Sequence, residues 1–377
     1  MKKIALICLV LIIGFGFISA EDKVYTHPLK WYSPELMGQG NSTTANITGY
    51  NALFCNPAGI RTDKTEITAF SIQPSWSMDI FTFLDEHNSL GFAEALLNQA
   101  VENGMGIGAQ TSIGFARKGL GMAVFLSIDS LFPQVTSIPN VKGDVWATAG
   151  FVAGYSLDLN LLGLNWKIGA DLRPMYRMLF ANIDANNIID FADDIDSVKF
   201  DRLAGFGLGF DLGVQTTWKS LTFGVALKDV AGTTFHYKYA ESDYKGKKIP
   251  GTETNLAEKF IVPMTLRTGV CFHPQLFYSN FIDPKFHIDY TLPLYNEDKI
   301  IGSEKGTFWT NLCLGTEVTI FEILDLRAGL NGGYFSAGLG LDLWVFEISA
   351  ALYSQELGAY AGHKGTMGGV VEFSVKL

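Results

Sequence analysis

Apolar and polar positions alternate one by one over long stretches of this sequence. Between 203 and 218, the even positions are mostly apolar, while the odd positions mostly carry glycine, an acid or an amide. The even set comprises Ala204, Phe206, Leu208, Phe210, Leu212, Val214, Thr216 and Trp218, and the odd set includes Gly205, Gly207, Gly209, Asp211, Gly213 and Gln215. Because successive side chains of a β-strand point to opposite faces, this pattern predicts a strand with one apolar face.

The same period returns at 164–173, at 311–320 and in the last residues, 371–377. In all, the pattern predicts about fourteen strands, an even number, as bacterial membrane barrels require. The predicted strands are 64–76, 104–117, 119–131, 143–158, 163–178, 203–217, 219–230, 259–273, 281–291, 307–320, 322–332, 334–342, 344–354 and 366–377.

The division of charge between the two faces indicates what surrounds these strands. A soluble β-sandwich or a lipocalin-like barrel also alternates, but its exposed face carries charges. Here the charged residues share a face with the glycines. In lipid, only helices and closed barrels satisfy every backbone polar group. After the first twenty residues there is no apolar run of about 18 residues, which a spanning helix needs, so we predict an all-β transmembrane barrel in a bacterial outer membrane.

Connection lengths support this prediction. Barrels of this kind keep their periplasmic turns short and allow long extracellular loops. The long connections, 77–103, 132–142, 179–202, 231–258, 292–306 and 355–365, all follow odd-numbered predicted strands. Even-numbered strands are followed by brief turns such as those at Lys118 and Phe321, with 274–280 the longest. The tight connection at Gly332 and Gly333 is the exception, because it falls where a long loop is expected.

The sequence pattern near the N-terminus predicts that the chain has three parts. Lys2 and Lys3 precede an apolar run, 4–18, and the small residues Ser19 and Ala20. This is the layout of a secretory signal peptide, with cleavage expected after Ala20. The next segment does not alternate, so we predict a signal peptide at 1–20, an N-terminal segment at 21–63 that is separate from the wall, and a barrel at 64–377.

Composition excludes several classes of protein. The sequence is 48% hydrophobic, 13% aromatic and only 18% charged, with 40 glycines. Removing the signal peptide takes away two lysines and no acid, so the formal net charge falls from -10 to -12, which disfavours nucleic acid as a partner. Three cysteines remain, Cys55, Cys271 and Cys313, so at most one disulfide can form among them.

One short motif stands in the N-terminal segment, the tetrapeptide Asn56, Pro57, Ala58 and Gly59. Pro57 fixes φ, Asn56 can cap a turn, and Gly59 permits a left-handed exit, so the residues alone predict a compact turn. Together with Met37-Gly38-Gln39-Gly40 upstream, the motif resembles the FadL-type outer-membrane transporters of long-chain fatty acids and other hydrophobic molecules. The stretches 326–330, 338–340 and 356–358 also resemble this broad group, which includes PorV-like barrels.

This resemblance implies a role for the N-terminal segment. In the FadL-type family, this part of the chain folds into the barrel as a hatch, and the Asn-Pro-Ala motif belongs to it. Carried over to this sequence, Asn56, Pro57 and Ala58 become hatch residues. The resemblance also implies about fourteen strands, which agrees with the even number that barrels require.

Two long connections contain helical patterns. In 91–103 the apolar residues recur at helical spacing and share one face. They are Phe92, Ala93, Leu96, Leu97, Ala100 and Val101. In the resembling family, extracellular helices form an apolar groove for substrate, so Phe92, Leu96, Leu97, Ala100 and Val101 are candidate groove residues. Packing of this helix on the barrel rim is the alternative. A second helix is predicted at 184–195, with its acids facing solvent.

Catalytic and metal-binding signals are weak. His287 and Asp289 fall on the same, lumenal face of a predicted strand, but no serine in a nucleophile context accompanies them, so a polar network is expected rather than an active site. The other histidines lack metal-ligand spacing. We therefore expect no enzyme activity, no metal site and no cofactor.

The function that follows from the resemblance is passive uptake of long-chain fatty acids or other hydrophobic small molecules. A capture groove, a hatch that shifts and an opening in the wall toward the outer-membrane lipid would serve it. Two alternatives stay open: a PorV-like scaffold or shuttle for exported surface proteins, and a surface adhesin acting through the loop 231–258.

Overall fold

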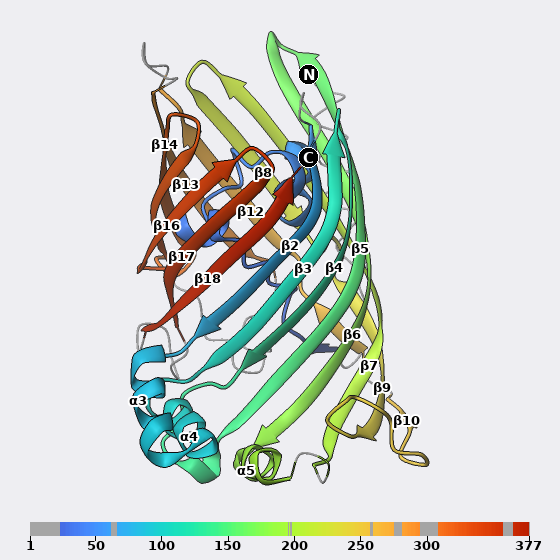
Figure 1. Ribbon diagram of the computed structural model, residues 1–377. Helices are drawn as coiled ribbons and strands as arrows, with labels where there is room; N and C mark the ends of the chain where they lie inside the picture. The colour runs from blue at the N-terminus through green and yellow to red at the C-terminus, as the bar shows by residue number, and fades with distance from the viewer. Residues whose placement is uncertain are drawn as a thin grey trace.

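The computed structural model describes residues 23–61, 66–194, 196, 198–256, 259–274, 281–294, 308–356 and 365–376. The predicted signal peptide lies outside the described residues. The described strands form one sheet that closes into a tilted barrel, with helices gathered at one end (Figure 1).

The wall is built from antiparallel strands. They are β2 (Glu66–Ser77), β3 (Gly106–Arg117), β4 (Leu120–Leu131), β5 (Lys142–Leu161), β6 (Leu164–Asp184), β7 (Phe200–Trp218), β8 (Leu221–Lys228), β9 (Thr233–Ser242), β10 (Thr254–Asn255), β11 (Lys259–Val262), β12 (Thr265–Phe272), β13 (Ile282–Pro293), β14 (Leu312–Ile320), β15 (Leu324–Asn331), β16 (Tyr334–Leu343), β17 (Phe346–Glu356) and β18 (Gly365–Lys376). The last strand, β18, pairs with β2 and closes the barrel.

Two wall positions are shared by consecutive strands. β8 and β9 lie end to end and together form one strand of the wall, because β7 pairs with β9 over its first half and with β8 over its second half. β10, β11 and β12 likewise form the next strand of the wall. β10 and β11 pair with β9, and β12 pairs with β8. The wall therefore has fourteen strands, as the alternation predicted. The prediction of a loop over the whole of 231–258 is wrong, because β9 continues the wall there.

The two faces of the wall differ as predicted. In β4, Ala123 and Phe125 are buried toward the lumen, whereas Val124, Leu126 and Ile128 on the other face are more than half exposed. A barrel whose outer face is apolar satisfies its backbone hydrogen bonds within the sheet and meets lipid with its side chains. The chain is thus an outer-membrane barrel. Among the described helices, none is long and apolar enough to cross a membrane.

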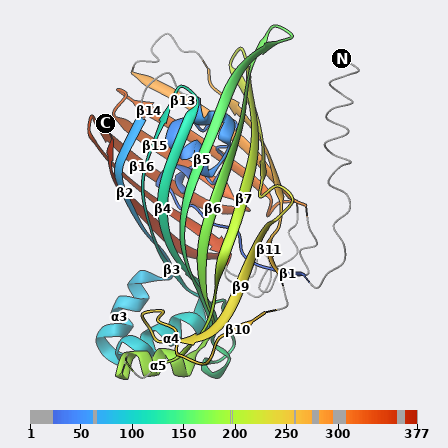
Figure 2. The same cartoon turned by 90° about the vertical axis from the view of Figure 1, so that its right-hand side faces the viewer.

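The two ends of the barrel differ in their connections. At one end, tight turns join the strands, and at Lys118-Gly119 both central residues have positive φ, 48° and 92°. Such turns match the twist of paired strands. The other end carries the long connections with α3 (Ile80–Leu90), α4 (Phe92–Glu102) and α5 (Ala185–Asp193), and is the extracellular end on the rule of connection length (Figures 1 and 2). The tight turn at Gly332 and Gly333 also lies at this end, as the sequence indicated.

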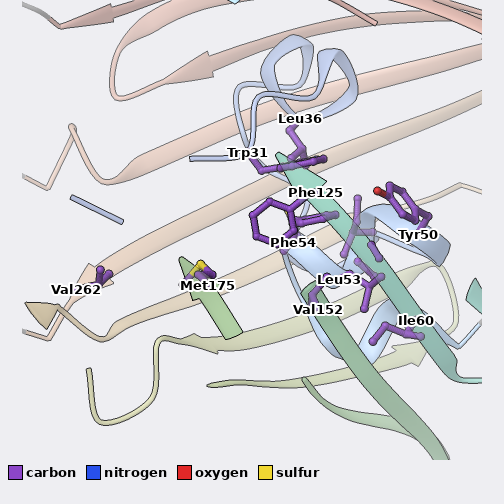
Figure 3. Packing of buried hydrophobic residues seen from close by; sticks show 14 of the residues in the cluster. Trp31, Leu36, Tyr50, Leu53, Phe54, Ile60, Phe125, Val152, Met175 and Val262 are labelled. Carbon is purple, nitrogen blue, oxygen red and sulfur yellow. The ribbon is translucent and has the colours of Figure 1, made fainter. Parts of the chain in front are cut away.

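The N-terminal segment lies inside the barrel. It begins with β1 (Lys23–Tyr25), which pairs in parallel with β11. It then forms α2 (Pro34–Gly38) and the short 3-10 helices η1 (Gly49–Phe54) and η2 (Pro57–Ile60). Figure 3 shows Trp31 and Phe54 of this segment beside Phe125 of the wall, and the Trp31 and Phe54 rings stack with 3.8 Å between centroids.

This packing explains why glycines share the lumenal face with charges. A Cβ on Gly213 would lie 2.0 Å from the Asn56 Oδ1 atom, and one on Gly169 would lie 2.2 Å from the Pro57 carbonyl oxygen. Side chains at these two positions would push the N-terminal segment out of its seat. The lumenal glycines therefore provide room for a second layer of chain inside the wall.

The turn at Asn56–Gly59 forms as predicted, with one correction. Asn56 caps η2, since its side chain accepts a hydrogen bond from the Ala58 amide at 3.1 Å. Gly59 is not in the left-handed region, so the predicted left-handed exit is wrong. A glycine fits there for a steric reason, because a Cβ would lie 2.0 Å from the carbonyl oxygen of Ile47.

Candidate functional site

An apolar groove of about 320 Å³ lies at the extracellular end, between α4, α5 and the ends of four strands. Its lining is apolar apart from one asparagine and the hydroxyl of a tyrosine. The lining residues are Phe92, Leu96, Phe132, Val145, Phe180, Ile183, Asn187, Ile188, Phe200 and Tyr244. A surface of this kind binds hydrophobic molecules, because it removes their apolar area from water without leaving polar groups unpaired.

The structure divides the candidate groove residues into two groups. Phe92 and Leu96 line the groove, and Phe92 is half exposed. Leu97 and Ala100 are buried, and with partly buried Val101 they belong to the packed cluster that attaches α4 to the rim. One face of α4 therefore lines the groove, while another packs on the barrel rim. Direct contact of any of the five residues with a ligand stays a prediction.

Several groove residues were not predicted from the sequence. Ile183 and Ile188 come from the end of β6 and from α5, and Tyr244 comes from the connection after β9. The helix α3 was also missed, although Asp79 caps it by accepting from the Thr82 amide at 3.2 Å. An aspartate three residues before a threonine at the start of an apolar run is a weak signal, but it was available.

A second cavity, of about 290 Å³, lies in the lumen beside the N-terminal segment. Its lining includes apolar and cationic side chains together with Asp229 and neutral polar residues. The apolar and aromatic ones include Leu29, Trp31, Tyr32, Leu36, Met37 and Phe54, and the cationic ones are Lys30, Arg173, Lys228 and Arg267. The cavity can therefore hold a molecule that has both an apolar part and an anionic part.

Most of these cations are already paired. Arg173 donates to Asp211 at 2.8 Å and to Asp229 at 3.1 Å. Lys228 pairs with Asp211 and donates to the Phe54 carbonyl at 3.0 Å. Since these groups are almost fully buried, breaking one partner away would leave an uncompensated charge. The network therefore holds the wall and the N-terminal segment together rather than offering a free cation.

Lys30 differs from the other three cations. Within the part of the chain that the structure describes, its ammonium makes no hydrogen bond or ion pair, although it interacts electrostatically with the Asp129 carboxylate, which lines two of the same cavities. It borders the large lumenal cavity and two smaller ones. An ammonium in such a position can meet a ligand carboxylate.

The N-terminal segment is anchored at the Asn-Pro-Ala motif. Asn56 Nδ2 donates to the Thr44 carbonyl at 2.8 Å, and Ser156 of β5 donates to the Ala58 carbonyl at 2.8 Å. The Thr44 amide donates to Asp289 at 2.8 Å. These bonds join the segment to itself and to the wall, which is the arrangement that the hatch interpretation requires.

The remaining candidate residues show no catalytic arrangement in the described chain. Asp289 and His287 face the lumen as predicted, but both ring nitrogens of His287 lack a partner, so the predicted polar network includes Asp289 and not His287. Cys55, Cys271 and Cys313 are buried and free. Burial raises the pKa of the Cys55 thiol, and Arg267 opposes the shift. No group of three metal-ligating side chains comes together among the described residues.

Comparison of the chain with solved structures supports this architecture, whereas two other comparisons found no match. No protein-family model matches the sequence, and no curated protein sequence matches it. Solved structures do match. The Pseudomonas putida toluene transporter TodX is 12% identical with a TM-score of 0.52, and the match covers 93% of this chain and 99% of that one.

A Pseudomonas aeruginosa FadL homologue gives a similar result. It is 11% identical with a TM-score of 0.53, and the match covers 94% of this chain and 99% of that one. At this identity the likeness concerns the fold. The chain has the fold of the FadL-type outer-membrane barrels, as its sequence resemblance implied.

Proposed function

We propose that this protein carries hydrophobic small molecules passively across the outer membrane, and that long-chain fatty acids are among them. The observation that carries the proposal is the lumenal cavity, whose lining combines aromatic side chains with the Lys30 ammonium. A general pore for polar solutes would need an open lumen, whereas here the N-terminal segment packs against the wall inside the barrel, beside a cavity of mixed lining.

The route we propose has three parts. The groove between α4 and α5 collects the apolar ligand. The N-terminal segment acts as a hatch that shifts to admit the ligand to the lumenal cavity. The ligand then leaves through the wall where the ladder is interrupted, since β7 changes partner between Gly207, which pairs with β9, and Leu212, which pairs with β8.

The chemistry of the lumenal cavity favours a carboxylate over a neutral hydrocarbon. Trp31, Leu36 and Phe54 offer contact to an alkyl chain, and Lys30 offers a charge-assisted hydrogen bond to the head. The toluene transporter of the same fold is so named for a neutral compound, so the fold alone does not select the ligand. Lys30 is the residue through which this chain would make the selection.

An uptake assay in a bacterial host that lacks its own fatty-acid transporter tests the proposal. We expect the protein to confer uptake of radiolabelled oleate, and we expect Ile188→Asp, which places a charge in the groove, to reduce uptake because apolar contact is lost. Asn140→Ala, at an exposed loop position, is the matched control and should leave uptake unchanged. No uptake from a correctly inserted wild-type protein would contradict the proposal.

A further inference from the structure

The groove between α4 and α5 lies against the outer face of the barrel wall, and the alternation of the strands shows this directly. In β5 the exposed, lipid-facing residues are at odd positions such as Phe151 and Leu157, and Val145 of the groove has the same parity in an unbroken ladder. In β6 the exposed residues are even, such as Ile168 and Leu172, and so is Phe180 of the groove.

The neighbouring strands give the same result. In β7, Phe206 and Leu208 face outward, and Phe200 of the groove continues their series without a bulge. In β4, Val124 and Ile128 face outward, and Phe132 follows them at the bridge to Met105. The floor of the groove is therefore a direct continuation of the surface that the barrel presents to lipid.

Arg202 also projects from the outer face, since it lies opposite Phe180 in the β6 and β7 ladder. Its side chain is buried by protein, with 6% of its area exposed, and its guanidinium donates to the Tyr176 hydroxyl at 3.3 Å. Protein therefore covers the outer face of the wall beside the groove.

Protein also lines part of the groove away from this floor. α4 and α5 form two walls, and Tyr244 from the connection after β9 lines a third side. That connection lies against the outer face, since a Cβ on Gly246 would be 3.4 Å from Phe180. The volume, about 320 Å³, is about twice the 150 Å³ of an engineered cavity that takes up benzene. The space suits a segment of an alkyl chain.

We infer that this groove opens sideways to the outer leaflet and takes an acyl chain from the membrane itself, rather than from the water above the barrel. The inference rests on the proposed function for its purpose, because it names the phase from which the cargo is collected. A hydrophobe that has dissolved among the acyl chains of the leaflet reaches the groove along a continuous apolar surface. No aqueous step intervenes between the leaflet and Phe180.

Photolabelling in a membrane tests the inference. The full mature chain is placed in nanodiscs of a phosphatidylcholine that carries a diazirine in the middle of one acyl chain, and labelled peptides are found by mass spectrometry. We expect labels on the outward belt around Leu172 and also on groove residues such as Phe180 and Ile188. Two variants fill the groove from opposite sides, Val145→Trp from the wall and Ile188→Trp from α5.

Either filling variant should lower groove labelling by about tenfold, equivalent to about 1.4 kcal/mol of lost occupancy, while belt labelling stays constant. Leu172→Trp, on the exposed belt, is the matched control and should leave groove labelling unchanged. A labelled belt with an unlabelled groove, in a protein that still imports oleate, would overturn the sideways opening and leave the proposed function standing. A labelled groove in a protein that does not import oleate would support the sideways opening and contradict the proposed function.

Discussion

The Asn56 side chain, whose hydrogen bonds shape the turn that lies against Gly213 of the wall, offers a test of whether the N-terminal segment moves separately from the barrel. Asn56 is fully buried in the motif turn. Its side chain accepts from the Ala58 amide at 3.1 Å and donates to the Thr44 carbonyl at 2.8 Å. Asn56→Ala removes both hydrogen bonds and leaves the backbone path of the turn free to form.

The expected loss follows from what each partner retains. The Thr44 carbonyl still accepts from Gln215 at 3.2 Å, so losing the first bond costs about 0.5–1.5 kcal/mol. The Ala58 amide is buried and keeps no other partner, so losing the second costs about 1–3 kcal/mol. Together the two losses destabilise the turn in its docked shape by about 1.5–4.5 kcal/mol, so opening of the segment should increase by about tenfold to about 2,000-fold.

Hydrogen exchange measures this opening. In Asn56→Ala the amides of η1 and η2 should exchange faster by that factor, while the amides of the wall strands keep their protection. Gly213→Ala disturbs the same turn from the wall side, because its Cβ would lie 2.0 Å from Asn56 Oδ1. It should likewise speed exchange in η1 and η2 and leave the wall strands protected. Asn140→Ala, which removes an exposed bond to Ser137, is the control. Unchanged exchange in η1 and η2 for both buried variants would refute independent motion of the segment.

Three further predictions concern charge and burial. Lys30→Met should weaken oleate binding by about tenfold and binding of a neutral hydrocarbon much less, as isothermal titration would show; equal losses would contradict a carboxylate contact. Leu172→Arg should destabilise the barrel by about 2–4 kcal/mol in bilayer unfolding experiments, and no change would contradict lipid contact there. With Cys271 and Cys313 replaced by serine, Cys55 should resist maleimide at pH 8, because burial raises its thiol pKa. Rapid labelling of the folded protein would contradict this protection. For the same reason, the contribution of Cys55 to the free energy of unfolding should fall as the pH rises above about 9, the ordinary pKa of a thiol, because the unfolded chain then releases the proton first.

The wall was predictable because two different surroundings act on alternate residues. The segment 203–217 corresponds to β7 (Phe200–Trp218), and each of the other predicted strands likewise has a counterpart in the wall. Lipid outside and glycine or polar groups inside impose a period of two that no helix reproduces. The strand ends were less certain. β6 runs past its predicted end at 178 to Asp184 in the extracellular rim, where lipid no longer enforces the pattern, and β5 runs past its predicted end at 158 to Leu161 at the opposite end of the barrel.

β9 escaped prediction because its pattern is reversed. The turn between Lys228 and Thr233 changes which parity faces inward, so Phe235 and Tyr237 point into the lumen and pack in the core around the N-terminal segment. The outward positions include His236 and Lys238, which a lipid-facing strand would not carry. A search for apolar side chains on the outer face passes over such a strand, although its alternation is intact.

The sequence alone shows that the residues of the groove floor face outward, although it does not show that they form a groove. Phe200 lies beyond Arg202 on the outer face, where the Arg202 side chain is buried by protein. An apolar outward residue at this covered end of the wall contacts another part of the chain or a ligand. In this structure α5, Tyr244 and the groove share that task at Phe200 and Phe180. The parity of these residues is readable from the sequence, whereas the helices that turn them into a binding surface are placed by tertiary packing.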